Sequence, residues 1–574
     1  DFSSWKNNIC IAADDGDEAI HAEQADRGSD TLLLKNTSQP RLGFRVNKIY
    51  IDSYYMDPQT QKYPEANREL MKQFNEGMLV FNYIGHNDPE VGFTGEGLFS
   101  RYEMDHLTNT RLPLFITITC DYCQFDAEDV SAGENVFLNP SAGAIALITT
   151  TRVVYTDGND KINRRLMKRL LERDSNGSPL RIGDVLKLAK RDFNTEIDKN
   201  KLNYVLIGDP ALKLAYPEHS IQVTRINGNS GKKNIEMIPG KNYTVEGEIR
   251  SHQNELLSDF NGYIYYNLYD KEKQFTTLAH QDKKTWTYTH RPDLLTTGKG
   301  TIQNGTFRIT VTLPIDNSHS GKSGLLNLYA YDESGREANG YTDKLIVSTA
   351  VEPITEDIQG PDIEFAGIND DSFTEGILVN NPATFVCKFS DPSGIWSGNS
   401  LGKQMTLSLD GACIEENVAR YYKPIAESEI PEGEFIYPLP RLSNGLHTLT
   451  FKVFDTLGNS SEVTIAFEVK ENSETYTISL EEEPATERAT ISCQDQNGND
   501  VTESKHTRIS VTNTLGEEIW SYETTENNPF PLTWNLQDNN GKRVSAGQYY
   551  CKGYFETSAG TIVTPAKKIV VITQ

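Results

Sequence analysis

Short apolar runs alternate with amphipathic segments over roughly the first 215 residues. The runs are rich in β-branched and aromatic residues, as in buried strands, and the segments between them show helical spacing of apolar positions. We expect strands at 8–13, 47–51, 79–84, 114–119 and 143–149, and helices near 64–76, 160–173 and 182–195. Strand–helix alternation of this kind predicts a parallel sheet covered by helices on both faces, which is a three-layer α/β domain.

The pattern changes near residue 216, where helical spacing disappears. Strands that alternate apolar and polar residues are now separated by turn clusters such as Asn227-Gly228-Asn229 and Asn539-Asn540-Gly541. Short strands with frequent turn signals predict all-β immunoglobulin-like sandwich domains in tandem. Interruptions of the pattern near 352 and 472 then predict a multidomain chain, divided into 1–215, 216–352, 353–471 and 472–574.

Composition narrows the partners that the chain can have. The 574 residues exceed what one core can organise, and the net charge of -26 is spread along the chain. A diffuse negative field argues against nucleic acid as a partner and repels anionic membrane surfaces. No apolar run of about 18 residues is present to cross a bilayer as a helix. The first residues resemble the middle of a domain, so we expect the natural chain to begin before Asp1.

The seven cysteines are too few and too scattered for a disulfide framework. The last four of them could form one or two bridges. The odd total leaves at least one thiol free.

Two of the expected strands end in reactive side chains. His86 follows the strand at 79–84, and Cys120 follows the strand at 114–119. Parallel strands end at one edge of a sheet, so the imidazole and the thiol are expected side by side. A thiol titrates near ~8.5 and needs a base to become a nucleophile at neutral pH. A buried structural thiol beside a turn histidine explains these two positions equally well.

Neighbouring residues fit the catalytic interpretation. Gly85 permits a bend before His86, and backbone N–H groups beyond Cys120 could face a developing oxyanion. Asp14 and Asp15 follow the first strand at the same edge, where a carboxylate could orient the imidazole. Cys123 is the weaker candidate nucleophile, and its CxxC spacing has no second pair to suggest a zinc or redox site.

Five collinear segments resemble the gingipain-type C25 cysteine peptidases, whose fold is caspase-like. They are CIAADDGD (10–17), NYIGHNDPEVGF (82–93), LPLFITITCDYCQFD (112–126), AGAIALITTTRVVY (142–155) and YVLIGDPALKL (204–214). The resemblance implies a nucleophile at Cys120, a base at His86 and an orienting acid at Asp15, with Asp14 as the near alternative. The family has Gly-Ser after the histidine where this chain has Asn87-Asp88; we expect Asn87 to tolerate the left-handed conformation.

Within that family, the chain resembles the sortases of the type IX secretion system of Bacteroidetes. The signals are Thr119-Cys120-Asp121 followed by Gln124-Phe125-Asp126, the ADDGD segment, and a last domain similar to a type IX C-terminal domain. This implies a cell-surface endopeptidase at the outer face of the outer membrane. It would remove the C-terminal signal domain of cargo proteins through a Cys thioester and transfer the cargo to anionic lipopolysaccharide or water. The implied partners are cargo, an outer-membrane β-barrel shuttle of the PorV type and other attachment-complex proteins.

Two other functions stay open. A secreted gingipain-like endopeptidase that degrades host proteins would use Glu18 or Asp17 as a carboxylate for Arg or Lys side chains. An inactive surface adhesin is the second alternative, and Asn87-Asp88 is its main support.

No cofactor is required by any of these functions. A structural Ca²⁺ is compatible with the acidic clusters Asp14/Asp15/Asp17, Asp88/Glu90 and Asp126/Glu128/Asp129.

Overall fold

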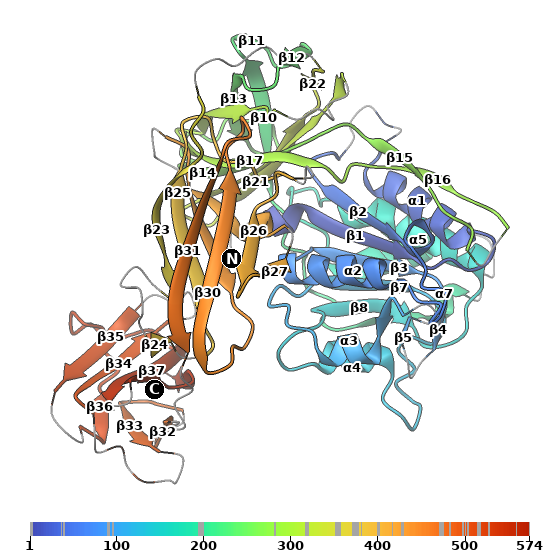
Figure 1. Ribbon diagram of the computed structural model, residues 1–574. Coiled ribbons are helices and arrows are strands. Elements are labelled where there is room, and N and C mark those ends of the chain that lie inside the picture. The colour runs from blue at the N-terminus through green and yellow to red at the C-terminus, as the bar shows by residue number, and fades with distance from the viewer. Residues whose placement is uncertain are drawn as a thin grey trace.

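A computed structural model gives the arrangement of most of the chain (Figure 1). It describes residues 4–35, 37, 41–88, 92–93, 97–192, 200–280, 283–315, 321–349, 357–369, 378–379, 381–398, 402–415, 417–425, 430–469, 476–481, 484–495, 499, 501, 504–513, 518–525, 529–557 and 560–572. The boundaries predicted near 352 and 472 lie outside these residues.

The N-terminal part is built on one six-stranded sheet. In spatial order the strands are β2 (Arg45–Tyr50), β1 (Asn8–Ala13), β3 (Val80–Ile84), β7 (Leu114–Ile118), β8 (Ala146–Thr150) and β9 (Tyr204–Ile207). The first five run parallel, while β9 pairs antiparallel with β8 at the edge. The carboxyl ends of β1, β3 and β7 therefore meet at one edge of the sheet.

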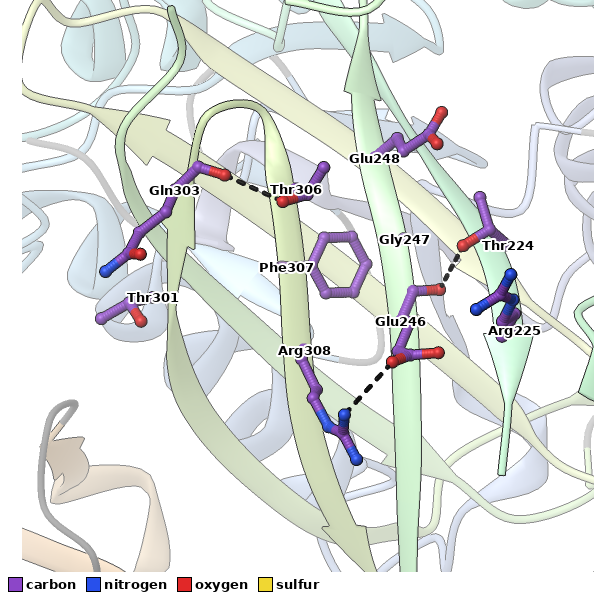
Figure 2. Close-up of a pocket in the computed structure, with 10 residues that line it drawn as sticks. All are labelled: Thr224, Arg225, Glu246, Gly247, Glu248, Thr301, Gln303, Thr306, Phe307 and Arg308. Atoms are coloured by element: carbon purple, nitrogen blue, oxygen red, sulfur yellow. Dashed lines mark hydrogen bonds and ion pairs between the residues drawn. The ribbon is translucent and has the colours of Figure 1, made fainter. Parts of the chain in front are cut away.

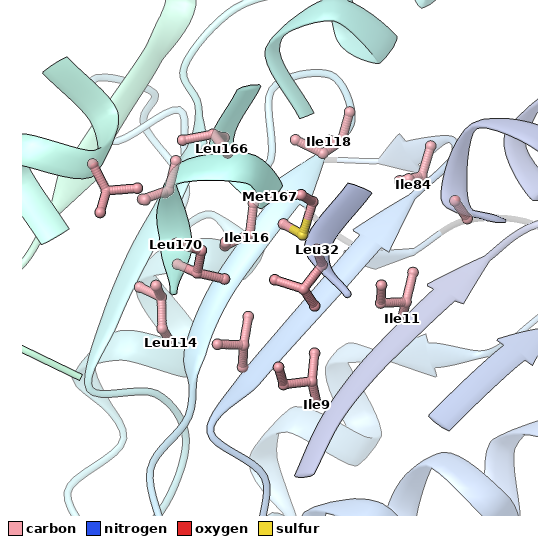
Figure 3. Packing of buried hydrophobic residues seen from close by; sticks show 14 of the residues in the cluster. Ile9, Ile11, Leu32, Ile84, Leu114, Ile116, Ile118, Leu166, Met167 and Leu170 are labelled. Atoms are coloured by element: carbon pink, nitrogen blue, oxygen red, sulfur yellow. The ribbon is translucent and has the colours of Figure 1, made fainter. Parts of the chain in front are cut away.

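Helices cover both faces of this sheet, because successive strand residues point to opposite sides. Ile9 and Ile11 pack with helices α1, α5 and α6 (Figure 3), whereas Cys10 and Ala12 pack with α2 and α4. The helices are α1 (Ile20–Leu32), α2 (Pro64–Glu76), α3 (Arg101–Asp105), α4 (Ala132–Leu138), α5 (Thr156–Leu170), α6 (Ile182–Arg191) and α7 (Asn200–Asn203). Short 3₁₀ turns lie at Ser4–Asn7, Ile51–Ser53 and Ala419–Tyr421, and β4 (Asn87–Asp88), β5 (Gly92–Phe93) and β6 (Phe99–Ser100) form a small separate sheet.

The second part contains an eight-stranded sheet whose ends meet. Its order is β11 (Asn229–Ser230), β10 (His219–Ile226), β13 (Asn242–Arg250), β18 (Thr306–Thr312), β17 (Leu294–Gln303), β14 (Gly262–Tyr269), β20 (Leu325–Asp332) and β21 (Glu337–Thr342). A parallel pairing of β10 with β21 closes the sheet on itself, a feature that was not part of the predicted β-sandwich. The closure needs Gly340, because a Cβ there would lie 2.2 Å from the Ile221 carbonyl oxygen. A three-stranded sheet of β12 (Ile235–Met237), β22 (Leu345–Val347) and β19 (Lys322–Ser323) accompanies it.

The last two parts are pairs of mainly antiparallel sheets around separate cores. One pairs β23 (Asp362–Ile368), β25 (Thr384–Ser390), β29 (Glu432–Pro438) and β28 (Tyr422–Ile425) against β24 (Leu378–Val379), β31 (Ser460–Val469), β30 (Gly445–Phe454), β26 (Thr406–Leu409) and β27 (Ala412–Glu415). The other pairs β32 (Thr477–Leu480), β33 (Ala489–Gln494) and β36 (Leu532–Trp534) against β35 (Glu518–Thr524), β34 (His506–Thr512), β37 (Gly547–Thr557), β38 (Gly560–Val563) and β39 (Lys567–Val571).

A two-stranded arm leaves the second part and lies against the N-terminal domain (Figure 1). It consists of β15 (Lys273–Thr276) and β16 (Thr287–His290) with the segment between them. The buried carboxylate of Asp52 accepts hydrogen bonds from the backbone N–H groups of Ala279 (2.7 Å) and His280 (2.9 Å). Tyr288 enters the hydrophobic core on the α1 side of the sheet. The arm is therefore packed as part of the N-terminal domain, although it comes from the second part of the chain.

All seven cysteines are free thiols, so the bridges considered for the last four do not form. Among the described residues, no helix is long and apolar enough to span a membrane.

Candidate active site

The strand register brings His86 and Cys120 to the same place. Ile84 of β3 lies opposite Ile118 of β7, and each reactive residue comes two positions later on its own strand. The pairing continues to Gly85, whose N–H donates to the Ile118 carbonyl at 3.4 Å. Since neighbouring strands are about 4.8 Å apart, the two residues leave the sheet edge side by side. The predicted juxtaposition of imidazole and thiol is therefore present in the backbone.

The Cys120 thiol is half-buried and is held by the peptide of Val154. The Sγ atom lies 3.3 Å from the Val154 carbonyl oxygen, and the Val154 N–H donates back to Sγ at 3.4 Å. Burial raises the pKa of Cys120, the Val154 N–H lowers it in part, and Asp121 raises it further. The thiol is therefore in its protonated, resting form at neutral pH. The sequence pointed to the segment of Val154 by resemblance but gave it no role.

No hydrogen bond joins His86 to Cys120 in this geometry. The imidazole is 57 % exposed, and its Nε2 lies 3.4 Å from the Asp17 carboxylate. Catalytic hydrogen bonds are often long before substrate binds, and an exposed side chain can rotate at little cost. The structure accordingly places the two residues at the ends of neighbouring strands, with no hydrogen bond between their side chains.

Asp14, rather than Asp15, is the acid that supports the histidine segment. One Asp14 oxygen accepts the His86 backbone N–H at 2.5 Å, and the other contacts Nδ1 of His21. Burial alone would raise the pKa of Asp14, but His21 and the His86 N–H lower it overall. A Cβ on Gly85 would lie 2.5 Å from this carboxylate, so the close approach requires glycine there.

Asp15, the residue expected to orient the imidazole, has a described contact on the opposite side of the sheet. Its buried carboxylate accepts a hydrogen bond from the Tyr63 hydroxyl at 2.6 Å, on the α2 side of the sheet. Side chains alternate between the two faces of a strand, so Asp15 would lie on the same α1 side as Ala13 if the strand continued. The chain turns after the strand instead, so Asp14 faces the α1 side and Asp15 faces the α2 side. The carboxylate that reaches the imidazole of His86 is that of Asp17.

Asn87 has a structural part in the site. It is the first residue of β4 and is extended, so the expected left-handed turn does not occur there. Its side-chain amide donates to the Cys120 carbonyl at 3.0 Å, which ties the histidine segment to the cysteine segment. The left-handed residue is instead Asp121, with φ 50°, directly after the candidate nucleophile.

The other predicted candidates fall into different surroundings. Cys123 is fully buried, and burial raises its pKa to about 11. Glu18 is ion-paired with Lys284 of the arm, and Asp17 faces two imidazoles. Neither carboxylate is thus placed alone at the base of a pocket for Arg or Lys. Glu90 lies outside the described residues.

A hollow on the eight-stranded sheet differs in chemistry from the sheet edge that carries Cys120 (Figure 2). Its surface is polar, with an ion pair between Arg308 and Glu246 at 3.5 Å. None of its ten lining residues is a Cys or a His. The candidate residues Cys120 and His86 lie instead at the edge of the N-terminal sheet.

Residues 1–215 match the model for Peptidase family C25. This match supports a cysteine peptidase in the N-terminal part of the chain, in agreement with the paired His86 and Cys120. The remaining 359 residues lie beyond the family match. No curated protein matches the chain in sequence.

Solved structures resemble the chain more distantly. Dimeric latent PorU from Porphyromonas gingivalis is 18% identical, with a TM-score of 0.32, and the match covers 99% of this chain and 64% of that one. The chain therefore spans about two thirds of the length of that protein. The complex of P. gingivalis RgpB pro- and mature domains is 16% identical, with a TM-score of 0.30, over 61% of this chain and 71% of that one.

Proposed function

We propose that the chain is a cysteine endopeptidase of the type IX sortase kind, with Cys120 as nucleophile and His86 as base. The observation that carries this is the strand register, which delivers both residues to one sheet edge inside the segment matched to Peptidase family C25. The sortase assignment itself is supported by the TCDYCQFD and ADDGD segments and by the terminal domain. A caspase-like relationship of the sheet is part of the same proposal.

The reaction begins when substrate brings the imidazole to the thiol. His86 takes the thiol proton, and the thiolate attacks the peptide carbonyl between cargo and signal domain. The C–N bond breaks, the departing amine takes the proton from His86, and the cargo remains as a thioester on Cys120. Water or an amine of anionic lipopolysaccharide then gives a proton to His86 and attacks the thioester carbonyl. The C–S bond breaks, and the leaving thiolate takes the proton back from His86. The acceptor that is positioned above the thioester decides between hydrolysis and transpeptidation.

The Val154 N–H supports this cycle at the sulfur. It already donates to Sγ, and a hydrogen bond to an ionised acceptor is about twice as strong as one to a neutral acceptor. The donor therefore stabilises the thiolate once His86 has removed the proton.

The test is replacement of Cys120 by Ala and of His86 by Ala in the native organism. Each change is expected to leave a folded protein and to let cargo accumulate with its C-terminal domain attached. Cys123→Ala is the matched control, because that thiol is buried away from the site and most processing should remain. Normal processing by the Cys120→Ala protein contradicts the proposal.

The terminal domain is proposed as the handle that holds the enzyme to a PorV-like barrel at the outer membrane. The spacing of Trp534, Gly541 and Tyr549 in the sequence has a structural counterpart in this domain. The rings of Trp534 and Tyr549 pack with their centroids 5.5 Å apart, and Gly541 lies in a turn with φ 79°. A chain without residues 475–574 should leave the membrane fraction and still react with thiol reagents. Retention of the shortened enzyme at the membrane would assign docking to the preceding domains.

Small peptide substrates distinguish the proposed sortase from the first alternative, a secreted endopeptidase of gingipain type. With Glu18 paired to Lys284 and Asp17 directed at the imidazoles, we expect no preference for peptides with Arg or Lys before the cleaved bond. An electrophilic peptide distinguishes the proposed enzyme from the second alternative, an inactive adhesin. In an active enzyme its reaction with Cys120 should depend on His86.

A further inference from the structure

Three acidic residues converge in the third part of the chain, which contains the strands from β23 to β31. Asp357 precedes β23, Asp391 follows β25, and Asp455 begins the turn between β30 and β31. Each residue offers one carboxylate oxygen, and these oxygens all lie within 4.8 Å of one another. Asp455 is fully buried, Asp391 is 2 % exposed and Asp357 is half-buried.

Hydrogen bonds fix the two buried carboxylates but leave one oxygen without a partner. Asp455 accepts the N–H groups of Leu457 (2.9 Å) and Asn459 (2.7 Å) and the side-chain amide of Asn459 (2.7 Å). Asp391 accepts the N–H (2.7 Å) and the hydroxyl (2.6 Å) of Ser393, and both donate to Oδ1. Within the described part of the chain, no donor reaches Oδ2 of Asp391. Buried polar atoms are normally satisfied, so this oxygen points to a ligand that the chain itself does not supply.

The charge of the cluster points to a cation as that ligand. In the described residues, no Lys, Arg or His side chain forms an ion pair with any of the three carboxylates. Burial raises the pKa of Asp391 and of Asp455, and the neighbouring carboxylates raise both further. Like charges buried this close together need a proton or a cation between them. A cation satisfies the free oxygen and the excess charge at once.

Calcium is the ion that these ligands suit. It binds hard oxygen ligands at about 2.3–2.6 Å in a flexible geometry, so oxygens on opposite sides of one ion are about 4.6–5.2 Å apart. Three oxygens within 4.8 Å of one another fit around such an ion. Magnesium keeps several of its water molecules and is seldom held by a cage of protein ligands. No imidazole or thiol belongs to the cluster, which disfavours zinc.

The cluster lies beside the junction between the second and third parts. Thr456, the residue after Asp455, accepts the N–H of Ile315 at 2.8 Å, and its own N–H donates to the Gly394 carbonyl at 2.9 Å. The Lys403 ammonium group donates to the Ile315 carbonyl at 2.7 Å. Ile315 follows β18 of the second part. The turns that carry the buried carboxylates therefore also hold the connection to the second part.

We propose that Asp357, Asp391 and Asp455 form a Ca²⁺ site that fastens the third part of the chain to the second. The proposal is independent of the chemistry assigned to the N-terminal domain. The ion binds the free oxygen of Asp391 and joins the segment that enters β23 to the two turns at the junction. Water completes the six to eight oxygen ligands of calcium on the side of the half-buried Asp357. Without the ion, the three like charges repel one another and the turns loosen.

The binding test uses the full chain after chelator treatment, with Ca²⁺ as the only added metal. Calorimetric titration should show a site that Asp391→Asn, Asp455→Asn and Asp357→Asn each weaken at least ~10-fold, because each change removes one charged ligand. Asparagine keeps one oxygen for the backbone donors of each turn. Glu468→Gln changes an exposed carboxylate near the other end of β31 and is the matched control. Calcium bound elsewhere in the chain is common to all of these proteins.

Circular dichroism separates a lost ligand from a lost fold, and Asp357→Asn alters a side chain outside the core. No calcium binding by the parent chain, or equal binding by the parent and the three Asp→Asn variants, overturns the site. Hydrogen exchange measures the junction: the peptides that contain Ile315 and Thr456 should exchange at least ~10-fold more slowly once calcium fills the site. The slowing should be absent in Asp357→Asn. Binding without slower exchange overturns the fastening role.

Discussion

At the residue scale, the proposed mechanism needs the half-buried thiol of Cys120 to be unreactive at rest and reactive once substrate binds. Burial favours the neutral thiol, while the Val154 N–H offers only partial compensation. The imidazole that would stabilise a thiolate is turned toward Asp17 at 3.4 Å. Reactivity is therefore expected to depend on whether the attacking reagent also reorganises His86.

This resting geometry predicts a pH dependence. Because the folded-state pKa of Cys120 is raised, the thiolate fraction at pH 7–8 falls below that of an ordinary thiol, whose pKa is near ~8.5. The rate of alkylation of Cys120 by iodoacetamide should rise with pH, with its midpoint above that value. His86→Ala should leave the midpoint unchanged, since no hydrogen bond joins the two residues. A midpoint near neutrality that moves upward in His86→Ala would show an ion pair in the free enzyme.

The position of the imidazole can be changed from a neighbouring backbone. A Cβ on Gly16 would lie 2.9 Å from His86 Cδ2, so Gly16→Ala should displace the exposed ring while costing little stability. Peptide cleavage is expected to fall ~10- to 100-fold, as happens when a catalytic group is misplaced by about 1 Å. Gly547→Ala is the control, because its Cβ would meet only the Tyr549 ring at 4.0 Å. Equal activity of the two variants would mean that the ring moves aside without consequence.

At the scale of elements, the arm connects the second part to the loop that contains Asp15, next to the candidate site. His280 lies 3.1 Å from Asp52 and 3.5 Å from the Tyr63 hydroxyl, which in turn donates to Asp15. The acidic loop is therefore bounded by the arm on the α2 side. Lys284 adds an exposed ion pair with Glu18.

The buried and the exposed contacts of the arm should contribute differently to the free energy of unfolding. Asp52→Ala removes the acceptor of two backbone N–H groups and should lower the free energy of unfolding by about 1–3 kcal/mol. Lys284→Ala should give no measurable change, because exposed ion pairs contribute little. Denaturant unfolding measures both, and hydrogen exchange should show faster opening at residues 277–280 in Asp52→Ala only. A larger loss in Lys284→Ala would reverse this assignment.

The same scale shows what the sequence could and could not predict. The strand at 8–13 and the helix at 64–76 occur with the expected bounds, since the first is a short apolar run and Pro64 marks the start of the second. The helix α1 was missed because its buried side is made of small or polar residues such as Ala22 and Ala25. The edge strand β9 is short and mostly half-buried, so its pattern is weak.

The site was predicted to the extent that strand ends define it. His86 and Cys120 follow from two parallel strands, whereas Asp15 depended on the path of a turn that alternation does not specify. His21 becomes visible only once α1 is packed beside β3. The arm could not be predicted, because its contacts with Asp52 join residues more than 220 positions apart.

At the scale of the whole molecule, the N-terminal domain and the second part share buried polar contacts. Lys6 is ion-paired with Glu337 at 2.7 Å, and the Asn327 amide donates to the Gly43 carbonyl at 2.8 Å. Asn7 and Asn339 are hydrogen-bonded at 3.0 Å in the same interface. Polar groups buried in this way stay satisfied only while both parts are folded.

These two parts should therefore unfold together, in a single transition. Calorimetry of a chain ending at residue 349 is expected to show one transition, with calorimetric and van't Hoff enthalpies that agree. A chain ending at residue 215 should melt at a lower temperature, because Asn7 and Asp52 lose their hydrogen bonds to the second part. Two separate transitions in the longer chain would show that the interface contributes little.

The free cysteines have a practical consequence for anyone who purifies the protein. Five of the seven thiols are fully buried, Cys413 is exposed, and Cys120 is half-buried. A folded chain carrying Cys413→Ser would then present one accessible thiol per molecule, located at the candidate nucleophile. Counting that thiol with a coloured disulfide reagent would measure the concentration of intact sites in any preparation, before a single substrate is known.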